Sequence, residues 1–433
     1  MQSIDKPGPG AENRAVAGQE GGSLAALREL NRRRVVATLE QLGVASRAEV
    51  ARRTGLSPST VSTLVAELES AGVVVARDGP PGDGLQVEEP SLRGGRPPRL
   101  IALGRAAGVA VGIDFGKQHL AVVACDRAHQ VLGETARVMP DGYDARRGMD
   151  DAAALLGHVL EGAGIDRAEV VGVGLGLPGP INPATGKVGS SAILPGWAGV
   201  TVGHQMGDRL RLPVHVDNDA NLGALAELHW GAGRGCDTLV YLKVATGIGA
   251  GLVVFGRLFR GAGGTAGEIG HTIIDESGPI CRCGSRGCLE TVAGIPAIVG
   301  LLAPSFGEDL TVEGVLRRAA EGDAACRRAI GDAGGHIGNA VANLCNLLNP
   351  ARIVVGGSLA GAREILLEPM RAAVARRAIP SAGEDVEIVA SALGDRAEVL
   401  GAVALVLYET RGAASAPTAS TKTGQPTEGK GRT

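Results

Sequence analysis

The stretch LPVHVDNDANLGALAELHWG (residues 212–231) passes from one kind of secondary structure directly into another. Its first half reads as a strand that ends in the polar run DNDAN at 217–221, and its second half reads as a helix. A strand that ends in polar residues just before a helix is typical of α/β proteins, in which the strand ends carry the ligand site.

The same alternation extends over residues 107–411. Helices are expected at 151–164 and at 335–350, where the apolar residues fall on one helical face. Strands that alternate with helices, with glycine-rich loops where the strands end, predict an α/β fold for this region. The expected strands lie at 109–116, 120–126, 131–138, 169–188, 212–221, 238–261 and 351–358.

Residues 23–105 have a different organisation. A first helix is expected to end at Gly43, and two shorter helices are expected to begin after the capping residues Ser46 and Ser57, with Gly55 in the turn between them. Two strands with a basic loop between them would follow as a wing, so the segment predicts a winged helix-turn-helix. The helices are expected over 24–42, 46–55 and 57–71, and the strands over 73–77 and 93–103.

Arginines give this N-terminal segment the charge that a DNA contact needs. Residues 24–77 carry eight basic and five acidic side chains, a net charge of +3, whereas the whole chain carries −3. Small hydroxyl side chains at the start of the third helix could bind phosphates or base edges in a major groove. The alternative is a small helical interaction module with solvated arginines. The candidate DNA-contacting residues are Arg47, Ser57, Ser59, Thr60, Thr63 and Arg96.

The run SRAEVARRTGLSPSTVS (46–62) resembles the winged helix-turn-helix in the repressor branch of the ROK family, which is named for repressors, open reading frames and sugar kinases. Residues 107–411 resemble the sugar-kinase-like domain of the same family. This second resemblance rests on the motifs NDAN (218–221), GTAGEIGH (264–271) and CRCGSRGCLE (281–290). It implies an α/β domain of the actin/hexokinase type, with two lobes around a cleft.

The resemblance also implies a sugar site. It assigns sugar contacts to Asn218, Glu268, His271 and Glu290, and it makes Asp219 both a sugar contact and, in a kinase, the general base. A carboxylate in that position would accept the proton of a hydroxyl that attacks a phosphoryl group. Each of these residues has a plainer explanation as a helix cap or a solvated side chain, and for 217–221 the plainer explanation is a cap formed by Asp219 or Asn221.

Three cysteines within eight residues form the strongest chemical signal in the chain. Reduced thiols at Cys281, Cys283 and Cys288 suggest tetrahedral Zn²⁺, and His271, ten residues upstream, is the natural fourth ligand. A site with three cysteines and one histidine is closed, so the Zn²⁺ would be structural. The alternative is three reduced cysteines in a mobile loop. Four further cysteines lie in apolar or helical contexts and are expected to be inert: Cys125, Cys236, Cys326 and Cys345.

The nucleotide motifs are mixed. The kinases of the family have Asp-x-Gly-Gly-Thr in their first phosphate loop, whereas this chain has DFGKQ at 114–118, without the second glycine and the hydroxyl. Close approach of backbone to phosphate needs glycine, so the sequence argues against binding of ATP and Mg²⁺. The second loop, TGIGAG at 246–251, and the turn VVGGS at 354–358 are nearly intact. The residues that would bind a nucleotide are Asp114, Gly116, Thr246, Gly247, Gly249, Gly356 and Gly357.

Composition and the chain ends restrict the class of protein. Glycine makes up 68 of 433 residues without a collagen period, and aromatic residues are only 2% of the chain, so the core must be aliphatic. Neither a signal peptide nor an apolar run of ~18 residues is recognisable, which predicts a cytoplasmic protein without a membrane span. Residues 1–22 and 412–433 are expected to be disordered tails.

Three hypotheses follow for the function. The first is a sugar-responsive transcriptional regulator, expected to be a repressor of carbohydrate metabolism genes, that binds double-stranded operator DNA as a homodimer or homotetramer. The second is an ATP-dependent sugar kinase of the glucokinase/hexokinase type with an extra DNA-binding domain. The third is a scaffold stabilised by Zn²⁺ that binds no ligand. The intact sugar motif favours the first, and the altered phosphate loop opposes the second.

Overall fold

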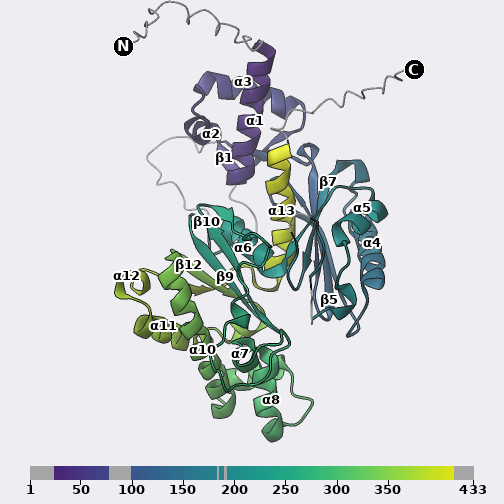
Figure 1. Cartoon of the computed structure of the whole chain (residues 1–433). Helices are drawn as coiled ribbons and strands as arrows, with labels where there is room; N and C mark the ends of the chain where they lie inside the picture. The colour runs from purple at the N-terminus through teal and green to yellow at the C-terminus, as the bar shows by residue number, and fades with distance from the viewer. Residues whose placement is uncertain (1–23, 78–98, 183–184, 190–192, 414–433) are drawn as a thin grey trace, which may run out of the picture.

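The computed structural model describes residues 24–77, 99–182, 185–189 and 193–413 (Figure 1). The tail expected at 1–22, most of the tail expected at 412–433, and Arg96 in the basic loop lie outside the described residues. Within the described part, no helix has the length and apolar character needed to cross a membrane.

The N-terminal domain is a three-helix unit with a small antiparallel sheet in the order β1-β3-β2. The Ser46 hydroxyl accepts the backbone N–H of Glu49, and the Ser57 hydroxyl accepts that of Thr60, so both predicted caps are present. Gly55 ends the second helix at φ 71°, a conformation that favours glycine. The elements are α1 (Leu24–Leu42), β1 (Val44–Ser46), α2 (Arg47–Thr54), α3 (Pro58–Ser70), β2 (Val74–Arg77) and β3 (Leu100–Leu103).

The first helix is covered over only part of its length. Its apolar residues recur close to one helical face, but Leu27 and Leu30 are 53% and 49% exposed. The second half of α1 provides the core contacts, through the fully buried Val35 and Leu39. The helical spacing therefore gave the correct element, but only the half of α1 that lies against α2, α3 and the sheet is covered.

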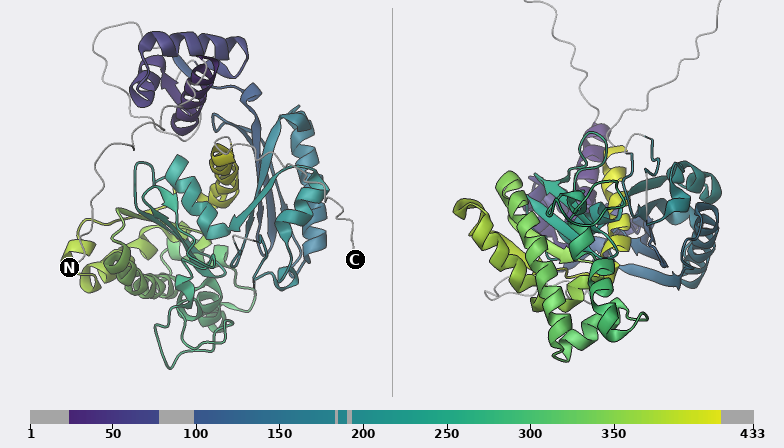
Figure 2. Two further views of the ribbon diagram at one scale, coloured as in Figure 1. Left: turned by 45° about the horizontal axis from the view of Figure 1, so that its top comes forward. Right: turned by 60° about the horizontal axis from the view of Figure 1, so that its bottom comes forward.

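The rest of the chain forms two lobes that are built alike (Figures 1 and 2). Each lobe contains a five-stranded sheet in which two antiparallel pairings are followed by two parallel ones. The first sheet has the order β6-β5-β4-β7-β8, and the second has the order β11-β10-β9-β12-β13. The strands of the first are β4 (Val109–Phe115), β5 (His119–Asp126), β6 (Val131–Val138), β7 (Val170–Leu177) and β8 (Val214–Asn218). Those of the second are β9 (Leu239–Val244), β10 (Ile248–Val254), β11 (Arg257–Leu258), β12 (Arg352–Gly356) and β13 (Glu387–Ala390).

Helices cover the lobes, and two of them lie between the sheets. In the first lobe the outer helices are α4 (Ala145–Gly162) and α5 (Val202–Leu210). The second lobe carries α7 (Glu290–Ala293), α8 (Ile295–Phe306), α9 (Val312–Ala320), α10 (Ala324–Leu348), α11 (Glu364–Arg377) and α12 (Pro380–Gly383). The helices α6 (Asp219–Trp230) and α13 (Ala397–Ala413) pack on each other between the two sheets.

Glycines allow the backbones of α6 and α13 to come into contact with the backbones of the two sheets. A Cβ atom added at Gly174 of β7 would lie 1.9 Å from the carbonyl oxygen of Ala402 in α13. One added at Gly251 of β10 would lie 2.2 Å from the carbonyl oxygen of Ala220 in α6. The two helices also meet through glycine, because a Cβ at Gly401 would lie 1.9 Å from the Leu222 carbonyl oxygen. No other residue type fits at these crossings without a shift of backbone.

Several boundaries differ from the sequence prediction. α6 begins at Asp219, three residues earlier than its apolar pattern suggested, because Asn218 caps it. α4 and α10 begin at Ala145 and Ala324, before the predicted starts at 151 and 335. Helix α13 was not among the predicted helices. Its residues are apolar nearly all round, as expected for a helix enclosed between two sheets.

The N-terminal domain docks on the first lobe at the turn between β5 and β6. Glu40 of α1 is buried and forms an ion pair with Arg127 in this turn. Arg77 of β2 lies 3.7 Å from the Asp126 carboxylate. In the same turn His129 adopts φ 67°, and its Nδ1 accepts the indole N–H of Trp230, the last residue of α6, at 2.6 Å. This turn therefore touches both the N-terminal domain and the end of α6.

Candidate functional site

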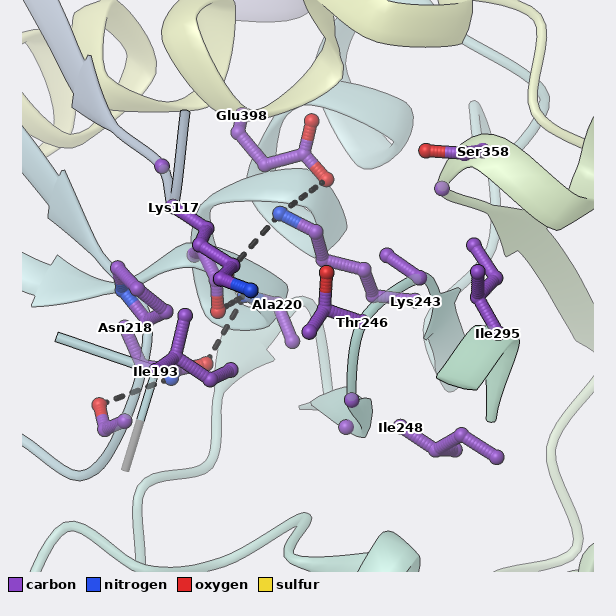
Figure 3. Close-up of a pocket in the computed structure, with 18 of the residues that line it drawn as sticks. Lys117, Ile193, Asn218, Ala220, Lys243, Thr246, Ile248, Ile295, Ser358 and Glu398 are labelled. Carbon is purple, nitrogen blue, oxygen red and sulfur yellow. Dashed lines mark hydrogen bonds and ion pairs between the residues drawn. The ribbon is translucent and has the colours of Figure 1, made fainter. Parts of the chain in front are cut away.

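A cleft of about 910 Å³ opens between the lobes (Figure 3). The first lobe contributes the β4–β5 turn at 116–119. The start of α6 supplies Asn218 and Asp219, and the second lobe adds the β9–β10 turn at 246–249. Strand ends and helix starts thus converge on one cavity, as the α/β pattern of the sequence predicted.

Most of the predicted sugar contacts meet in this cleft. Asn218, Asp219, Glu268 and His271 line it. Burial raises the pKa of Glu268, and the neighbouring His271 only partly offsets this rise. Glu290 lies deeper and is buried, with one carboxylate oxygen 2.7 Å from Arg282 Nη2 and the other 3.5 Å from His271 Nδ1.

Asn218 has a structural role that the sequence analysis gave to its neighbours. Its side-chain oxygen accepts the backbone N–H of Ala220 at 2.9 Å and caps α6, while its amide donates to the Gly179 carbonyl at 2.9 Å. The cap was expected from Asp219 or Asn221. Asn221 instead donates to the buried Asp217 at 2.8 Å, while Asp219 lines the cleft and also accepts the backbone N–H of Ala220 at 2.8 Å.

Asp219 is paired with a lysine that the sequence analysis missed. Lys243 Nζ lies 2.9 Å from Asp219 Oδ2 and 3.2 Å from Glu398 Oε1 (Figure 3). Burial alone would lower the pKa of Lys243, but the carboxylates of Asp219 and Glu398 outweigh it and raise this pKa. Burial also raises the pKa of Glu398, although Lys243 opposes this. The carboxylate that would serve as a general base is therefore already neutralised by an ammonium group.

A second ion pair lies at the first phosphate loop. His119 Nε2 is 2.7 Å from Asp114 Oδ2, and the imidazole lies directly over Gly116, where a Cβ would meet it at 1.9 Å. Burial is the largest influence on Asp114 and would raise its pKa, but the hydrogen bond and charge of His119, together with the charge of Lys243, outweigh burial and lower this pKa. The same hydrogen bond raises the pKa of His119. The ring therefore covers the backbone that a phosphate would approach.

The predicted nucleotide residues are only partly gathered at the cleft. Gly116, Thr246, Gly247, Gly249 and Gly357 line it, whereas Asp114 lies behind His119 and Gly356 packs against the Tyr241 hydroxyl. The sequence did carry a signal for Lys243, since a lysine interrupts the apolar strand LVYLKV and lysine is rarely buried without a partner. Nothing in the sequence indicated that Glu398 is that partner.

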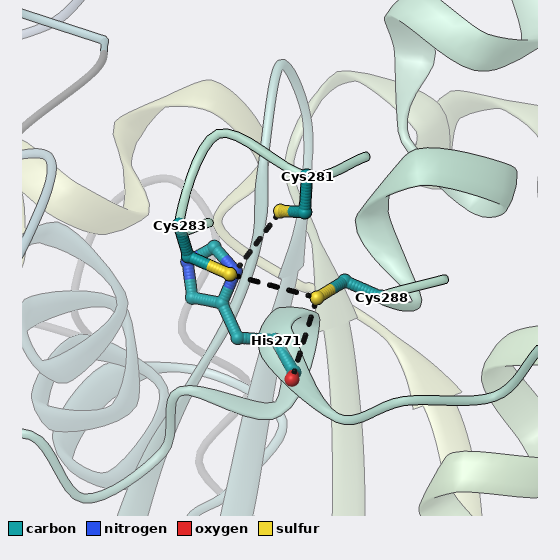
Figure 4. Close-up of side chains that lie close together, drawn as sticks. All are labelled: His271, Cys281, Cys283 and Cys288. Atoms are coloured by element: carbon teal, nitrogen blue, oxygen red, sulfur yellow. Dashed lines mark hydrogen bonds between the residues drawn. The ribbon is translucent and has the colours of Figure 1, made fainter. Parts of the chain in front are cut away.

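The predicted metal ligands lie together beside the cleft (Figure 4). The ligand atoms of His271, Cys281, Cys283 and Cys288 all lie within 4.8 Å of one another. His271 Nδ1 faces the thiols, 3.5 Å from Cys281 Sγ, while Nε2 lies 3.9 Å from Glu268 Oε2. The donor set of three thiols and one imidazole fits a structural metal ion such as Zn²⁺.

The predicted DNA-contacting residues lie in or beside α3. Ser59 and Thr63 are exposed on its surface, and so is Ser62, which the sequence analysis did not single out. Ser57 is used as the cap, with its oxygen 2.8 Å from the Thr60 hydroxyl. Arg47 of α2 pairs with Glu69 of α3 at 3.0 Å, which holds the two helices together. Arg96 lies outside the described residues.

Comparisons with known proteins cover both parts of the chain. A ROK family profile matches residues 110–409, and a winged helix-turn-helix DNA-binding profile matches residues 28–75. The xylose repressor of Caldicellulosiruptor bescii is 31% identical over 90% of this chain and 98% of the repressor. The glucokinase of Halalkalibacterium halodurans is 32% identical over 67% of this chain and 92% of the kinase. The crystal structure of a ROK family transcriptional regulator, a homologue of the E. coli Mlc protein, aligns with a TM-score of 0.71 at 26% identity and covers 89% of this chain and 97% of that one.

The ion pair between His119 and Asp114 predicts a pH-dependent contribution to stability. Because the pKa of His119 is raised, its contribution is complete below the unfolded value of about 6.5 and is lost as the pH rises through the folded value. Because the pKa of Asp114 is lowered, its contribution is lost as the pH falls below about 4. His119→Gln should therefore lower the melting temperature most near pH 5–6 and much less above pH 8.

The matched control is His158→Gln. His158 is exposed on α4 and bonds the Ala154 carbonyl of its own helix. The melting temperature of the His158→Gln protein should differ from that of the wild-type protein by a similar small amount at every pH. A His119→Gln difference that stays constant from pH 5 to pH 9 would contradict the assigned ion pair.

Proposed function

The chain belongs to the ROK family, and on that premise we propose that it regulates transcription by binding operator DNA under the control of a sugar held in its cleft. The observation that carries the proposal is the combination of a winged helix-turn-helix and a sugar-kinase-like cleft on one chain. A curated repressor shares this combination over 98% of its own length, whereas the similar glucokinase aligns with only 67% of this chain. The proposed site of action is the cytoplasm, where operator DNA is found.

The proposed DNA-binding surface is the exposed side of α3. Ser59, Thr60 and Thr63 would contact base edges or phosphates, with Ser62 added from the structure. Ser57 and Arg47 would act through α3, which they cap and brace. A homodimer would present two such helices to a palindromic operator.

The proposed sugar-binding site is the floor of the cleft. Asp219, Glu268 and His271 offer carboxylate and imidazole groups to sugar hydroxyls, and such groups form strong charge-assisted hydrogen bonds. Asn218 would contribute while it caps α6, and Glu290 would contribute through Arg282. The name of the curated repressor makes a pentose such as xylose one candidate among several sugars.

Helix α6 offers a route from the sugar to the DNA-binding domain. It begins at Asn218 and Asp219 in the cleft and ends, ~18 Å away, at Trp230. The Trp230 indole is bonded to His129, and the adjacent Arg127 is bonded to Glu40 of α1. A ligand that favours one position of α6 would thereby favour one position of the N-terminal domain.

We further propose that the cysteine cluster binds one structural Zn²⁺. His271 would bind the ion through Nδ1, which faces the thiols, and present Nε2 to the cleft. The ion would fix the ring orientation and the loop at 281–288, and so shape the sugar pocket.

A direct test of the function measures DNA affinity with and without sugars. A thermal-shift screen of pentoses, hexoses and N-acetylhexosamines identifies the ligand, and a duplex selected by the wild-type protein from a random library serves as operator. Ser59→Ala combined with Thr63→Ala should weaken DNA binding about tenfold, since a good base contact contributes ~1–3 kcal/mol.

The control for this test is Ser70→Ala, which removes an exposed hydroxyl at the far end of α3. A loss of affinity in the control equal to that of the double variant would refute the proposed DNA surface. Sugar turnover with ATP and Mg²⁺ at ~1–10³ s⁻¹ would instead establish the kinase.

The route through α6 predicts a separation of binding from coupling. Trp230→Phe keeps an aromatic ring but removes the N–H that bonds His129. Sugar affinity and DNA affinity should each be retained, whereas the ratio of DNA affinities with and without sugar should fall towards one. Allosteric effects of this kind typically correspond to ~1–3 kcal/mol.

The control is Trp197→Phe, since Trp197 is buried in the first lobe and its indole N–H has no hydrogen-bond partner there. A Trp230→Phe protein that responds to sugar as strongly as the control would show that the signal takes another route.

Removal of the metal provides a separate prediction. Cys283→Ser should abolish the single equivalent of Zn²⁺ expected per chain, lower the melting temperature and weaken sugar binding together, because a structural Zn²⁺ contributes directly to folding. Metal content by atomic emission and binding by calorimetry report the two effects. Cys236→Ser, at a half-buried cysteine outside the cluster, should change neither. Full sugar affinity in a metal-free Cys283→Ser protein would exclude the proposed role.

A further inference from the structure

The basic side chains that line the cleft are already paired. Among the described residues, each lysine and arginine of the lining has a carboxylate within 4 Å, and so has His119. The pairs are Lys117–Asp141 at 3.6 Å, His119–Asp114 at 2.7 Å, Lys243–Asp219 at 2.9 Å and Arg282–Glu290 at 2.7 Å. An incoming anion would have to compete with a carboxylate for each of these cations.

The lining is also acidic as a whole. Its described residues include three Lys/Arg, at 117, 243 and 282, against five Asp/Glu, at 219, 268, 313, 395 and 398. Solvent screens the exposed Glu313 and Asp395, so the acidic groups that act most strongly on a ligand are Asp219, Glu268 and Glu398. A neutral polyol can use the carboxylates as hydrogen-bond acceptors, whereas a phosphate would be repelled by them.

Among the cations of the cleft lining, Lys243 is the one that would lie beside the phosphate group of a bound sugar phosphate. It lies on the cleft floor beside Asp219, the proposed hydroxyl contact, so a phosphate ester on that hydroxyl would sit next to it. Two carboxylates, those of Asp219 and Glu398, share its single charge. Glu398 is itself fixed by the Tyr241 hydroxyl, which donates to the same oxygen at 3.1 Å. The single ammonium group of Lys243 is therefore already held by two carboxyl groups in a buried position.

Helix α6 does not offset the acidic charge of the lining. A helix N-terminus commonly binds phosphate through free backbone N–H groups. Here the N–H of Ala220 is already bonded to Asn218 Oδ1 and Asp219 Oδ1, at 2.9 and 2.8 Å. The first acidic residue of the helix, Asp219, adds a negative charge at the same end.

We infer that Lys243 and Glu398 determine the charge of the ligand, so that the cleft selects an uncharged sugar and rejects the same sugar as its phosphate ester. This inference rests on the proposed function, because it requires that the cleft binds a sugar. It assigns to Glu398 a role in specificity, since its carboxylate occupies the lysine that would otherwise receive the phosphate.

Calorimetry with matched pairs of ligands tests the inference on the full-length wild-type protein. The probes are D-xylose, D-glucose and N-acetyl-D-glucosamine, each compared with its phosphate esters, including both the 1- and the 6-phosphate of glucose. The free sugar that binds should do so at least about tenfold more tightly than its esters. This ratio corresponds to ~1.4 kcal/mol.

Glu398→Gln is the informative variant because it keeps the shape of the side chain and releases Lys243 from one carboxylate. The ratio of free-sugar to phosphate-ester affinity should shift about tenfold towards the ester. The control is Glu313→Gln, which removes an equal charge from an exposed residue of the cleft lining. Its ratio should change by less than twofold, since solvent screens an exposed charge.

The outcomes separate the two levels of proposal. Tighter binding of an ester than of the free sugar by the wild-type protein would overturn the inference and leave the proposed function standing. Equal shifts in the Glu398→Gln and Glu313→Gln proteins would overturn the role of the Lys243–Glu398 pair. If no sugar and no ester binds or alters DNA affinity, the proposed function itself fails. Should Glu398→Gln not fold, the wild-type comparison still decides whether the cleft prefers the uncharged sugar.

Discussion

The close contact of helices α6 and α13 with the two sheets is the constraint on which the rest of the structure depends. At Gly174, Gly251 and Gly401 the backbone of one element touches the backbone of another, leaving no room for a side chain. These backbone contacts, which we call the seam, fix the position of each lobe relative to the two helices. Because α6 starts at the cleft and α13 carries Glu398 to its floor, the same contacts also position the groups that are proposed to bind the ligand.

Local signals made much of the fold and part of the site predictable from the sequence. The hydroxyl caps at Ser46 and Ser57 and the spacing of the three cysteines act over a few residues, so the sequence order reveals them. The pairing of Lys243 with Glu398, 155 positions later, depends on how α13 enters between the sheets. The exposure of Leu27 and Leu30 likewise depends on which elements cover α1, and helical periodicity carries no such information.

The side chains of the polar run at 217–221 make different contacts from one another. Asp217 is buried and accepts hydrogen bonds from Arg260 and Asn221. Asn218 caps the helix, so Asp219 provides the carboxylate of this run that lines the cleft. Residues that look equivalent in the sequence thus differ in the structure, since some bond to the protein itself and others face the cleft. Motif matching assigned Asn218 to the ligand and missed the cap, because both roles favour the same residue type.

The buried pair between Glu40 and Arg127 makes the N-terminal domain an arm of the first lobe. A rotation of that lobe about the seam would be small where α6 and α13 touch, since backbone contacts leave little space there. The displacement produced by a rotation grows with distance from its axis, and α3 lies at the far end of the arm (Figure 1). In the proposed homodimer this arm would therefore act as a lever, so that a change of a few degrees at the cleft would alter the spacing between the two copies of α3.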